Sequence, residues 1–224
     1  MTYIDTAAAP AANFLAFPGF GPSDFDVFGI PGLEPRMEAL IAGIRPKLEL
    51  LGERLSPELA ALSGTEFFPH VAKHARRTVN PPKDTWVAFA ANKRGYKAHP
   101  HFQIGLWGTH AFIQFAVIYE APGKADFAAR AIARLEEIRS LVPSGAGYRW
   151  SGDHMQPGAE LHDSMSGEQL HGLFERLRSV KSAELLCGIH LDRNDPLLQN
   201  GEAFVAKAES IFQTLMPLYQ LAAQ

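Results

Sequence analysis

The sequence predicts an α+β fold, in which helices pack against a mostly antiparallel, curved sheet and a long helix ends the chain. Three observations predict it. Apolar residues recur every three or four positions over residues 33–62 and again over 204–219, which is typical of helices. Residues 66–119 change to a period of two, which is typical of strands, and helical and strand patterns alternate afterwards. The sequence contains no glycine-rich nucleotide-binding motif. This absence and the order of the elements exclude a dinucleotide-binding βαβ fold.

The composition is that of an ordinary globular protein. Of the 224 residues, 46% are hydrophobic and 20% are charged. The single cysteine, Cys187, excludes an intrachain disulfide and a thiolate zinc cluster. No apolar run approaches the ~20 residues of a membrane span, and the first residues lack the basic start of a secretory signal. We therefore predict a cytoplasmic protein that does not bind membranes.

The N-terminal part is predicted to hold a tail, a strand and a helical region. Residues 1–22 are rich in alanine, glycine and proline and are predicted to be a flexible tail, while residues 23–224 form a single domain. The alternation in Phe25–Ile30 predicts a first short strand. The helical stripe that follows is expected to kink at Pro46 and to restart at Ser56-Pro57, an N-cap followed by proline.

Four central segments are predicted strands. They are Glu66–Lys73, Trp86–Ala91, His101–Trp107 and Ala111–Tyr119. Gly108-Thr109 fits the two-residue turn of a β-hairpin between the last two. The hairpin makes antiparallel pairing the expectation for this part of the sheet.

The C-terminal part is predicted to alternate helix and strand. Apolar spacing predicts a helix over residues 127–142. Ser166 and Gln169 form a capping box that begins another helix, and Asn200-Gly201 begins the last one. The strands of this part are expected at Tyr148–Ser151 and Glu184–Leu191.

Five ordered strings carry a resemblance to a known family. They are FDVFGIPGLEPRMEA, HVAKHARRTVNPPKDTWVAFAANKRGYKAHPHFQIGLW, IYEAPGKA, LFERLRSVKSAELLCGIH and TLMPLY. With these strings the chain resembles the YktB-like family of bacterial proteins from Phe20 onward. The resemblance implies an α+β fold of the TATA-binding-protein or helix-grip type, in which a curved antiparallel sheet wraps a long C-terminal helix. It implies no particular activity.

Positive charge is concentrated between His70 and His101. This segment holds seven lysines and arginines against one acidic residue, Asp84, so its formal charge is +6, while the whole chain carries −3. It also holds four of the nine histidines. Neighbouring cations repel each other unless an anion or carboxylates lie among them, and arginine suits phosphate. The segment therefore points to an anionic ligand, with a solvated or ion-paired surface as the alternative.

We predict that this ligand is a phosphorylated small molecule or a nucleotide. The predicted ligand-binding residues are His74, Arg76, Arg77, Lys93, Arg94, Lys97, His99 and His101. Exposed aromatic residues such as Tyr96 could stack on bases, so nucleic acid stays a less favoured partner of an otherwise acidic chain. A further alternative is an enzyme acting on a nucleotide or phosphorylated substrate, with a histidine as acid or base.

The histidines of the same segment also bear on metal binding. His70 and His74 lie four positions apart, and His99 and His101 lie two apart, so each pair could share one face. No carboxylate at a matching spacing completes a hydrolytic zinc site, and the pair Asp153-His154 stands alone. We therefore predict no metal site. The sequence identifies no cofactor or oligomeric state, and it leaves open whether the protein is an enzyme.

Overall fold

The computed structural model describes residues 16–224, so most of the predicted N-terminal tail, residues 1–15, lies outside the described residues. The α+β prediction is confirmed, because helices pack against one sheet of seven strands that pair in the antiparallel sense. Across the sheet the strands follow the order β1-β2-β3-β4-β7-β5-β6. Their bounds are β1 Phe68–Val71, β2 Asp84–Ala90, β3 His101–Trp107, β4 His110–Val117, β5 Tyr148–Ser151, β6 Glu160–Leu161 and β7 Leu185–Asp192.

Helices form both ends of the described chain and several of the connections. The α-helices are α1 Pro22–Asp26, α2 Leu33–Ala39, α3 Arg45–Ser63, α4 Lys124–Ala133, α5 Leu135–Leu141, α6 Gly167–Ser179 and α7 Gly201–Ala222. Three 3-10 turns cover η1 Val27–Gly29, η3 His162–Ser164 and η4 Pro196–Gln199, and a π-helical turn, η2 Leu40–Ile44, joins α2 to α3.

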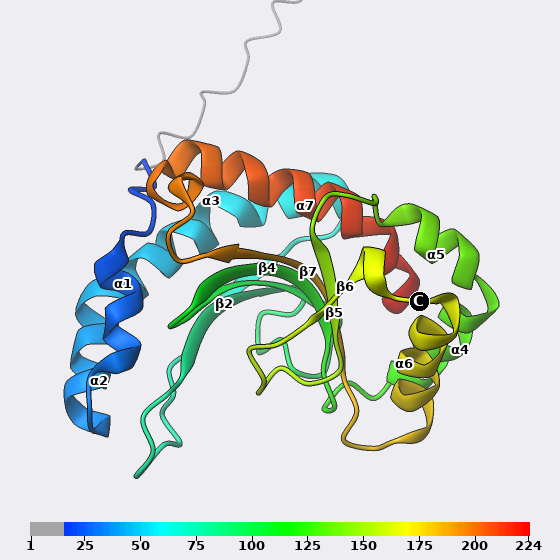
Figure 1. The fold of residues 1–224 in the computed structure, drawn as a ribbon, viewed down its shortest axis with the longest axis horizontal. Helices are drawn as coiled ribbons and strands as arrows, with labels where there is room; N and C mark the ends of the chain where they lie inside the picture. Colours follow the sequence, from blue (N-terminus) through cyan, green and yellow to red (C-terminus); the bar gives the residue numbers. More distant parts are fainter. Residues whose placement is uncertain (1–15) are drawn as a thin grey trace, which may run out of the picture.

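One face of the sheet forms the core. In Figure 1 the strands arch, and α3 and α7 lie over the outer side of the arch. The strand residues that point toward these helices are apolar and fully buried, among them Phe89, Phe102 and Phe115. The ring of Phe212 on α7 lies 4.9 Å from that of Phe102 and 5.7 Å from that of Phe89. Because aromatic rings bury large apolar areas, this layer carries much of the stability.

The other face of the sheet is polar, and we call it the polar face. Successive strand residues point to opposite sides, so the residues between the core positions share this face. They include Asp84, Trp86, His101, Gln103, Phe112, Gln114, Gly188 and His190. The register sets Gln103 opposite Gln114 and Phe112 opposite His190. Loops rather than long helices lie on this side of the arch in Figure 1.

The strand predicted at Phe25–Ile30 is wrong, because these residues belong to α1 and η1. Pro22 occupies the first turn of α1, where a missing backbone N–H is harmless. The carboxylate of Asp24 accepts the Gly21 N–H at 2.7 Å and pairs with Lys47 Nζ at 2.6 Å. These contacts stabilise a helical turn at residues where the alternating pattern predicted a strand.

Two predicted helix boundaries also differ. The restart at Ser56-Pro57 is wrong, since α3 continues through Pro57 to Ser63. Ser56 Oγ donates to the Gly52 carbonyl at 2.7 Å, and the buried residues Leu48 to Leu59 form one stripe on both sides of the proline. The kink near Pro46 takes the form of the π-helical turn that ends at Ile44. The helix predicted over residues 127–142 is divided at Arg134 into α4 and α5.

Several predicted elements are confirmed with their bounds. Strands β3 and β5 span the predicted residues, and residues 108–109 form the turn between β3 and β4. Ser166 and Gln169 make both bonds of the capping box, and Asn200 caps α7. Phe17 and Phe20, near the end of the predicted tail, are buried against Phe204 of α7.

Candidate functional site

The predicted ligand-binding residues fall into two connections at opposite ends of β2. Residues 72–83 join β1 to β2 and carry His74, Arg76 and Arg77. Residues 91–100 join β2 to β3 and carry Lys93, Arg94, Lys97 and His99. His101 is the first residue of β3. The structure therefore divides one cationic stretch of sequence into two groups.

The first connection begins with His74 in the left-handed backbone region, at φ 52°. Its Nε2 lies 3.2 Å from Thr85 Oγ1, and its ring meets Trp86 edge-on with centroids 5.7 Å apart. Burial, together with the charges of Arg77 and Arg45, lowers the pKa of His74 to about 4. This histidine is therefore neutral near pH 7, which leaves the exposed Arg76 and half-buried Arg77 as the cations of this group.

The second connection forms an open pocket, which we call the cationic pocket. It has a volume of about 520 Å³ and is lined mainly by residues that follow the C-terminal end of β2. The residues that line it are His70, Asn92, Arg94, Gly95, Tyr96, Lys97, Ala98, His99 and Glu120. Three predicted ligand-binding residues, Arg94, Lys97 and His99, thus meet at one cavity, whereas Lys93 is exposed outside it.

Tyr96 fixes the base of this pocket. Trp86 Nε1–H donates to the Tyr96 hydroxyl at 3.2 Å, and the Tyr96 ring lies 4.8 Å from the ring of His101. Burial raises the pKa of Tyr96 to about 12, so it stays a neutral phenol. Because its hydroxyl and one edge of its ring already have partners in the protein, Tyr96 acts as an anchor for the connection.

The charge balance of the cationic pocket is positive. Lys97 Nζ pairs with Glu120 Oε1 at 2.8 Å. The hydrogen bond from Lys97 lowers the pKa of Glu120, and the charge of Arg76 from the first connection lowers it as well. Arg76 therefore lies near enough to act on this pocket electrostatically. Among the described residues no carboxylate pairs with Arg94, so its guanidinium charge remains uncompensated.

His101 lies behind the pocket and not in it. The residue is fully buried; Nδ1–H donates to the His99 carbonyl at 2.8 Å, and Nε2 accepts from Gln103 at 3.0 Å. Gln114 Nε2 donates in turn to Gln103 Oε1 at 2.9 Å. Burial lowers the pKa of His101 to about 4. A neutral imidazole with two partners supports the polar face but has no free nitrogen to offer a ligand.

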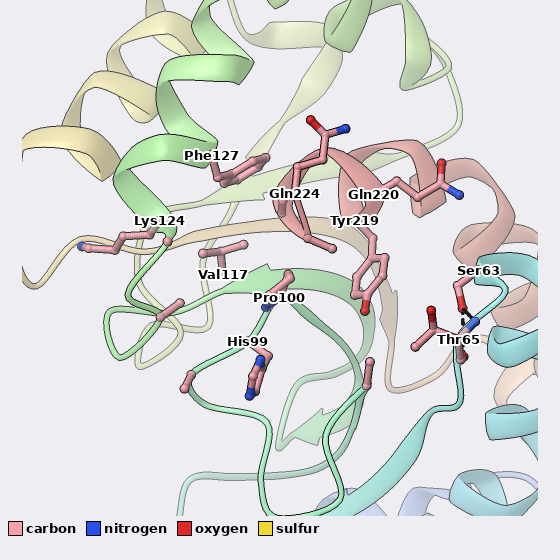
Figure 2. A pocket seen from close by; sticks show the side chains of 16 residues that line it. Ser63, Thr65, His99, Pro100, Val117, Lys124, Phe127, Tyr219, Gln220 and Gln224 are labelled. Atoms are coloured by element: carbon pink, nitrogen blue, oxygen red, sulfur yellow. Dashed lines mark hydrogen bonds between the residues drawn. The ribbon is translucent and has the colours of Figure 1, made fainter.

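A second cavity adjoins the cationic pocket at His99. It has a volume of about 520 Å³ and lies between the end of α7 and the start of α4 (Figure 2). Its only lysine is Lys124, whose Nζ donates to the carbonyls of Val180, Lys181 and Ala183 at 2.8, 2.8 and 2.7 Å. Figure 2 shows this amine directed away from His99. The cavity therefore presents no lysine or arginine charge to an anion.

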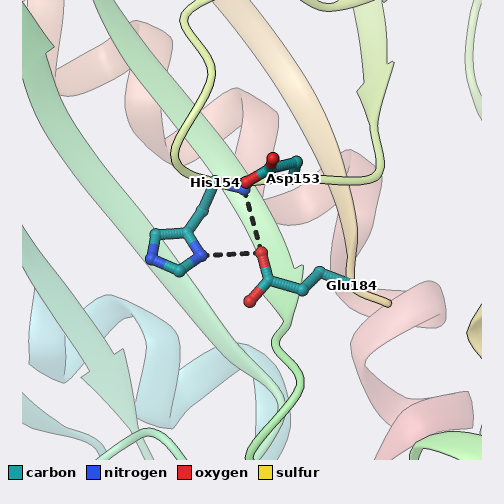
Figure 3. Close-up of side chains that lie close together, drawn as sticks. All are labelled: Asp153, His154 and Glu184. Carbon is teal, nitrogen blue, oxygen red and sulfur yellow. Dashed lines mark hydrogen bonds and ion pairs between the residues drawn. The ribbon is translucent and has the colours of Figure 1, made fainter. Parts of the chain in front are cut away.

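Sequence reasoning missed a carboxylate–imidazole pair on the polar face. Glu184 Oε2 accepts His154 Nδ1–H at 2.6 Å and the His154 backbone N–H at 2.9 Å (Figure 3). Burial alone would raise the pKa of Glu184, but the hydrogen bonds from His154 outweigh burial, so the pKa of Glu184 is lowered. Burial alone would lower the pKa of His154, but the hydrogen bond and charge of Glu184 outweigh it, so the pKa of His154 is raised. The two residues therefore form an ion pair. They lie 30 positions apart, so spacing along the chain gave no signal for them.

His154 also borders a small cavity on the polar face. This cavity has a volume of about 20 Å³, and Asp84, Gln103, Asp153 and His190 contribute to its lining. Such a volume holds about one water molecule. Asp84 is only 4% exposed, and burial raises its pKa to about 6 although the charges of His154 and Arg77 oppose this.

Comparisons with known proteins identify the family of the chain. The sequence matches the family described as "Domain of unknown function (DUF1054)" over residues 20–219. The chain belongs to the DUF1054 family. A UPF0637 protein of Bacillus velezensis is 54% identical over 202 residues, which are 90% of this chain and 95% of that protein. A UPF0637 protein of Bacillus mycoides is 51% identical over 202 residues, 90% of this chain and 96% of its own.

Membership of the DUF1054 family confirms the predicted YktB-like resemblance. It assigns no reaction, since the family description is one of unknown function. Within residues 16–224, no helix combines the length and apolar character that crossing a bilayer requires. Any function must therefore be argued from the pockets themselves.

Proposed function

We propose that this protein binds a small anionic, phosphate-bearing ligand in the cationic pocket. One observation carries the proposal: the 91–100 connection gathers Arg94, Lys97 and His99 around a single opening of about 520 Å³. Among residues 16–224, Glu120 is the only acidic residue in its lining, and Lys97 already compensates it. The positive charge left over comes from Arg94, with Arg76 nearby.

The chemistry of these donors suits a phosphate group. The guanidinium of Arg94 can bond two phosphate oxygens at once, and the Lys97 ammonium supplies further donors. The pocket is open, so the expected ligand is one whose phosphate enters and whose remainder stays partly in solvent. A phosphorylated small molecule or a nucleotide meets this description, and the predicted cytoplasmic location would supply both.

The structure favours a small ligand over nucleic acid. Binding a single strand requires aromatic faces that are free to stack on bases. Tyr96 is held by Trp86 and His101, and Trp107 is only 8% exposed. The whole chain also carries a formal charge of −3, which repels an extended phosphate backbone.

The same geometry favours binding over histidine catalysis. Of the three predicted histidines, His74 and His101 are held neutral by burial and have hydrogen-bond partners within the protein. Of these three, only His99 lines the pocket, together with His70, whose Nε2 lies 2.9 Å from the Asn92 carbonyl oxygen. The groups that distinguish this pocket are the cations Arg94 and Lys97, which suit an anion, so we assign the pocket a binding role.

A thermal-shift titration tests the proposal. Pyrophosphate and a nucleoside triphosphate should raise the melting temperature of the wild type, by a stabilisation of about 2.7 kcal/mol at a hundredfold excess over Kd. The double variant Arg94→Gln/Lys97→Gln should lose this response. Lys93→Gln, in the same connection but outside the pocket, should keep it.

Three results would contradict the proposal. One is an equal response of the wild type and the double variant, which would place any anion site elsewhere. The second is a response only to a short single-stranded oligonucleotide, with affinity falling steeply as salt rises, which would indicate nucleic-acid binding. Absence of any response to phosphate compounds also overturns it.

A further inference from the structure

We propose a second site, for a divalent cation, formed by Asp153, His154 and Glu184 on the polar face. It is independent of the cationic pocket. Each of the three residues offers one ligand atom, and these atoms all lie within 4.8 Å of one another (Figure 3). Within the described part of the chain, no other group of three histidine, cysteine or acidic side chains gathers in this way.

The spacing of the donor atoms fits one ion after a small adjustment. Zinc binds carboxylate and imidazole donors at about 2.0–2.2 Å, so two ligands of one ion lie at most about 4.4 Å apart. The observed limit of 4.8 Å requires only a few tenths of an ångström of closure. The His154 Nδ1–H bond to Glu184 Oε2 at 2.6 Å must open, with the cation taking the place of the proton between them.

The scaffold holds the two anchoring ligands in place. Glu184 is buried, and the backbone N–H groups of His154 and Tyr119 bond its carboxylate at 2.9 and 3.4 Å. The Nζ of Lys124 fixes the segment before Glu184 through three carbonyls, the last being that of Ala183. Asp153, by contrast, is exposed. The ion would therefore have a fixed inner side and an outer side open to water or a ligand.

An independent observation at the same cavity points to a missing positive charge. Asp84 is 4% exposed and lines the small cavity together with Asp153 and His154. In the described structure its carboxylate accepts a backbone hydrogen bond at Asp84 itself but forms no ion pair. A buried carboxylate without a cationic partner is costly. Three carboxylates thus surround one imidazole, with Arg77 the one other cation whose charge reaches Asp84.

The donor set determines the class of cation. Carboxylate oxygens with a single imidazole nitrogen suit manganese, zinc or magnesium better than Cu(I) or iron–sulfur centres, which favour the softer thiolate and thioether ligands. Cys187 cannot take part because its side chain points to the core on the other side of the sheet. The site we propose is therefore an oxygen-rich site for a divalent cation such as Mn²⁺ or Zn²⁺.

The test measures binding of the metal alone. Purified, chelator-treated protein is titrated with MnCl₂, followed by the electron paramagnetic resonance signal of free Mn²⁺, and with ZnCl₂ by calorimetry. We expect saturable binding of one ion per chain. Asp153→Asn should weaken it at least tenfold, Glu184→Gln should abolish it, and Asp84→Asn should weaken it several-fold by removing a nearby negative charge.

Controls separate this site from other causes. Glu168→Gln, an exposed acid in the first turn of α6, should leave cation affinity unchanged. Arg94→Gln/Lys97→Gln should also leave it unchanged, so failure of the cationic pocket and failure of this site are distinguishable. Asp153 is exposed, so its variant should fold even if Glu184→Gln does not. Absence of saturable binding, or equal affinity of the wild type and Asp153→Asn, would show that His154 and Glu184 form only an ion pair.

Discussion

The two faces of the sheet are made by alternate residues of the same strands, yet they have different tasks. On the core face, Phe102 lies among the aromatic rings of Phe67, Phe115, Phe212 and Tyr219. On the polar face, its neighbours His101 and Gln103 form a hydrogen-bond chain that continues to Gln114. The comparison shows that the period-two pattern of the strands determines both which residues form the core and which residues form the face available to a ligand.

The largest expected loss of stability comes from a substitution on the core face. Phe102→Ala should lower the free energy of unfolding by about 3–5 kcal/mol, since it removes a buried ring and leaves a cavity. Gln103→Ala on the polar face should cost about 1–3 kcal/mol, because it leaves His101 and Gln114 without a partner. Urea denaturation of both variants measures the difference. Equal costs would mean that the polar face contributes to stability as much as the core does.

Adding a methyl group at Gly188, on the polar face, should cause the next largest loss of stability. Gly188 lies between β4 and β5, and a Cβ there would come within 2.1 Å of the Ile113 carbonyl oxygen and 2.5 Å of Gln114 Cα. Gly188→Ala should therefore destabilise by about 3 kcal/mol through overpacking against backbone. Gly172→Ala on α6, where a Cβ meets nothing within 4 Å, is the matched control.

The control is expected to move in the opposite direction. Alanine in a helix interior is more favourable than glycine by roughly 0.5–1 kcal/mol, so Gly172→Ala should raise the midpoint of thermal unfolding. If Gly188→Ala were neutral, strands β4 and β7 would have to be more loosely paired than the structure shows.

The dependence of the free energy of unfolding on pH tests the polar face through His101. Its folded pKa of about 4 lies below the ordinary 6.5, so the folded state holds the imidazole neutral. The stability linked to this histidine is present above pH 6.5 and is lost as the pH falls toward 4. Between pH 7 and 4.5 the wild type should lose on the order of 2 kcal/mol more than His101→Gln.

Chemical denaturation at several pH values checks this expectation, with His171→Gln on α6 as the control. His74, His110 and His190 also have lowered pKa values, so the total acid sensitivity exceeds that of one residue. For that reason the difference between His101→Gln and the wild type is the informative quantity. A parallel pH profile for the two proteins would mean that His101 is reached by solvent.

The smallest expected effect concerns the anchor of the cationic pocket. Tyr96→Phe removes the acceptor of the Trp86 N–H and should cost about 1 kcal/mol. Amide hydrogen exchange should rise in residues 91–100 and stay unchanged in β4. Ser140→Ala, which removes an exposed hydroxyl on α5, should leave both quantities unchanged. Unaltered exchange in Tyr96→Phe would show that the connection is fixed by other contacts.

Much of the fold could be predicted because local signals agreed with the packing. The strand over residues 101–107 has core residues at alternate positions, and the cap residues Ser166 and Asn200 each bond a backbone N–H close by in the sequence. The errors arose where tertiary contacts decided the outcome. Lys47, 23 residues away, stabilises Asp24 in α1, and the continuous buried stripe of α3 carries the helix through Pro57.

The candidate sites were predictable only in part. The cationic pocket was found because Arg94, Lys97 and His99 are neighbours in the sequence. The carboxylate–imidazole pair was not found, because Glu184 comes next to His154 only through the pairing of β5 with β7. The available signal was the position of Glu184 directly before a strand that begins with the apolar run Leu185–Cys187.

The shape of the sheet has a consequence for self-association. An exposed strand edge invites pairing with another chain, and proteins counter this with short or interrupted edges. Both outer strands here are short, with four residues in β1 and two in β6. β1 also contains Pro69, which has no N–H to donate, and its ring lies against Gly52 of α3. Edge-to-edge growth of the sheet is thus blocked at both ends, so the long central strands remain shielded from aggregation.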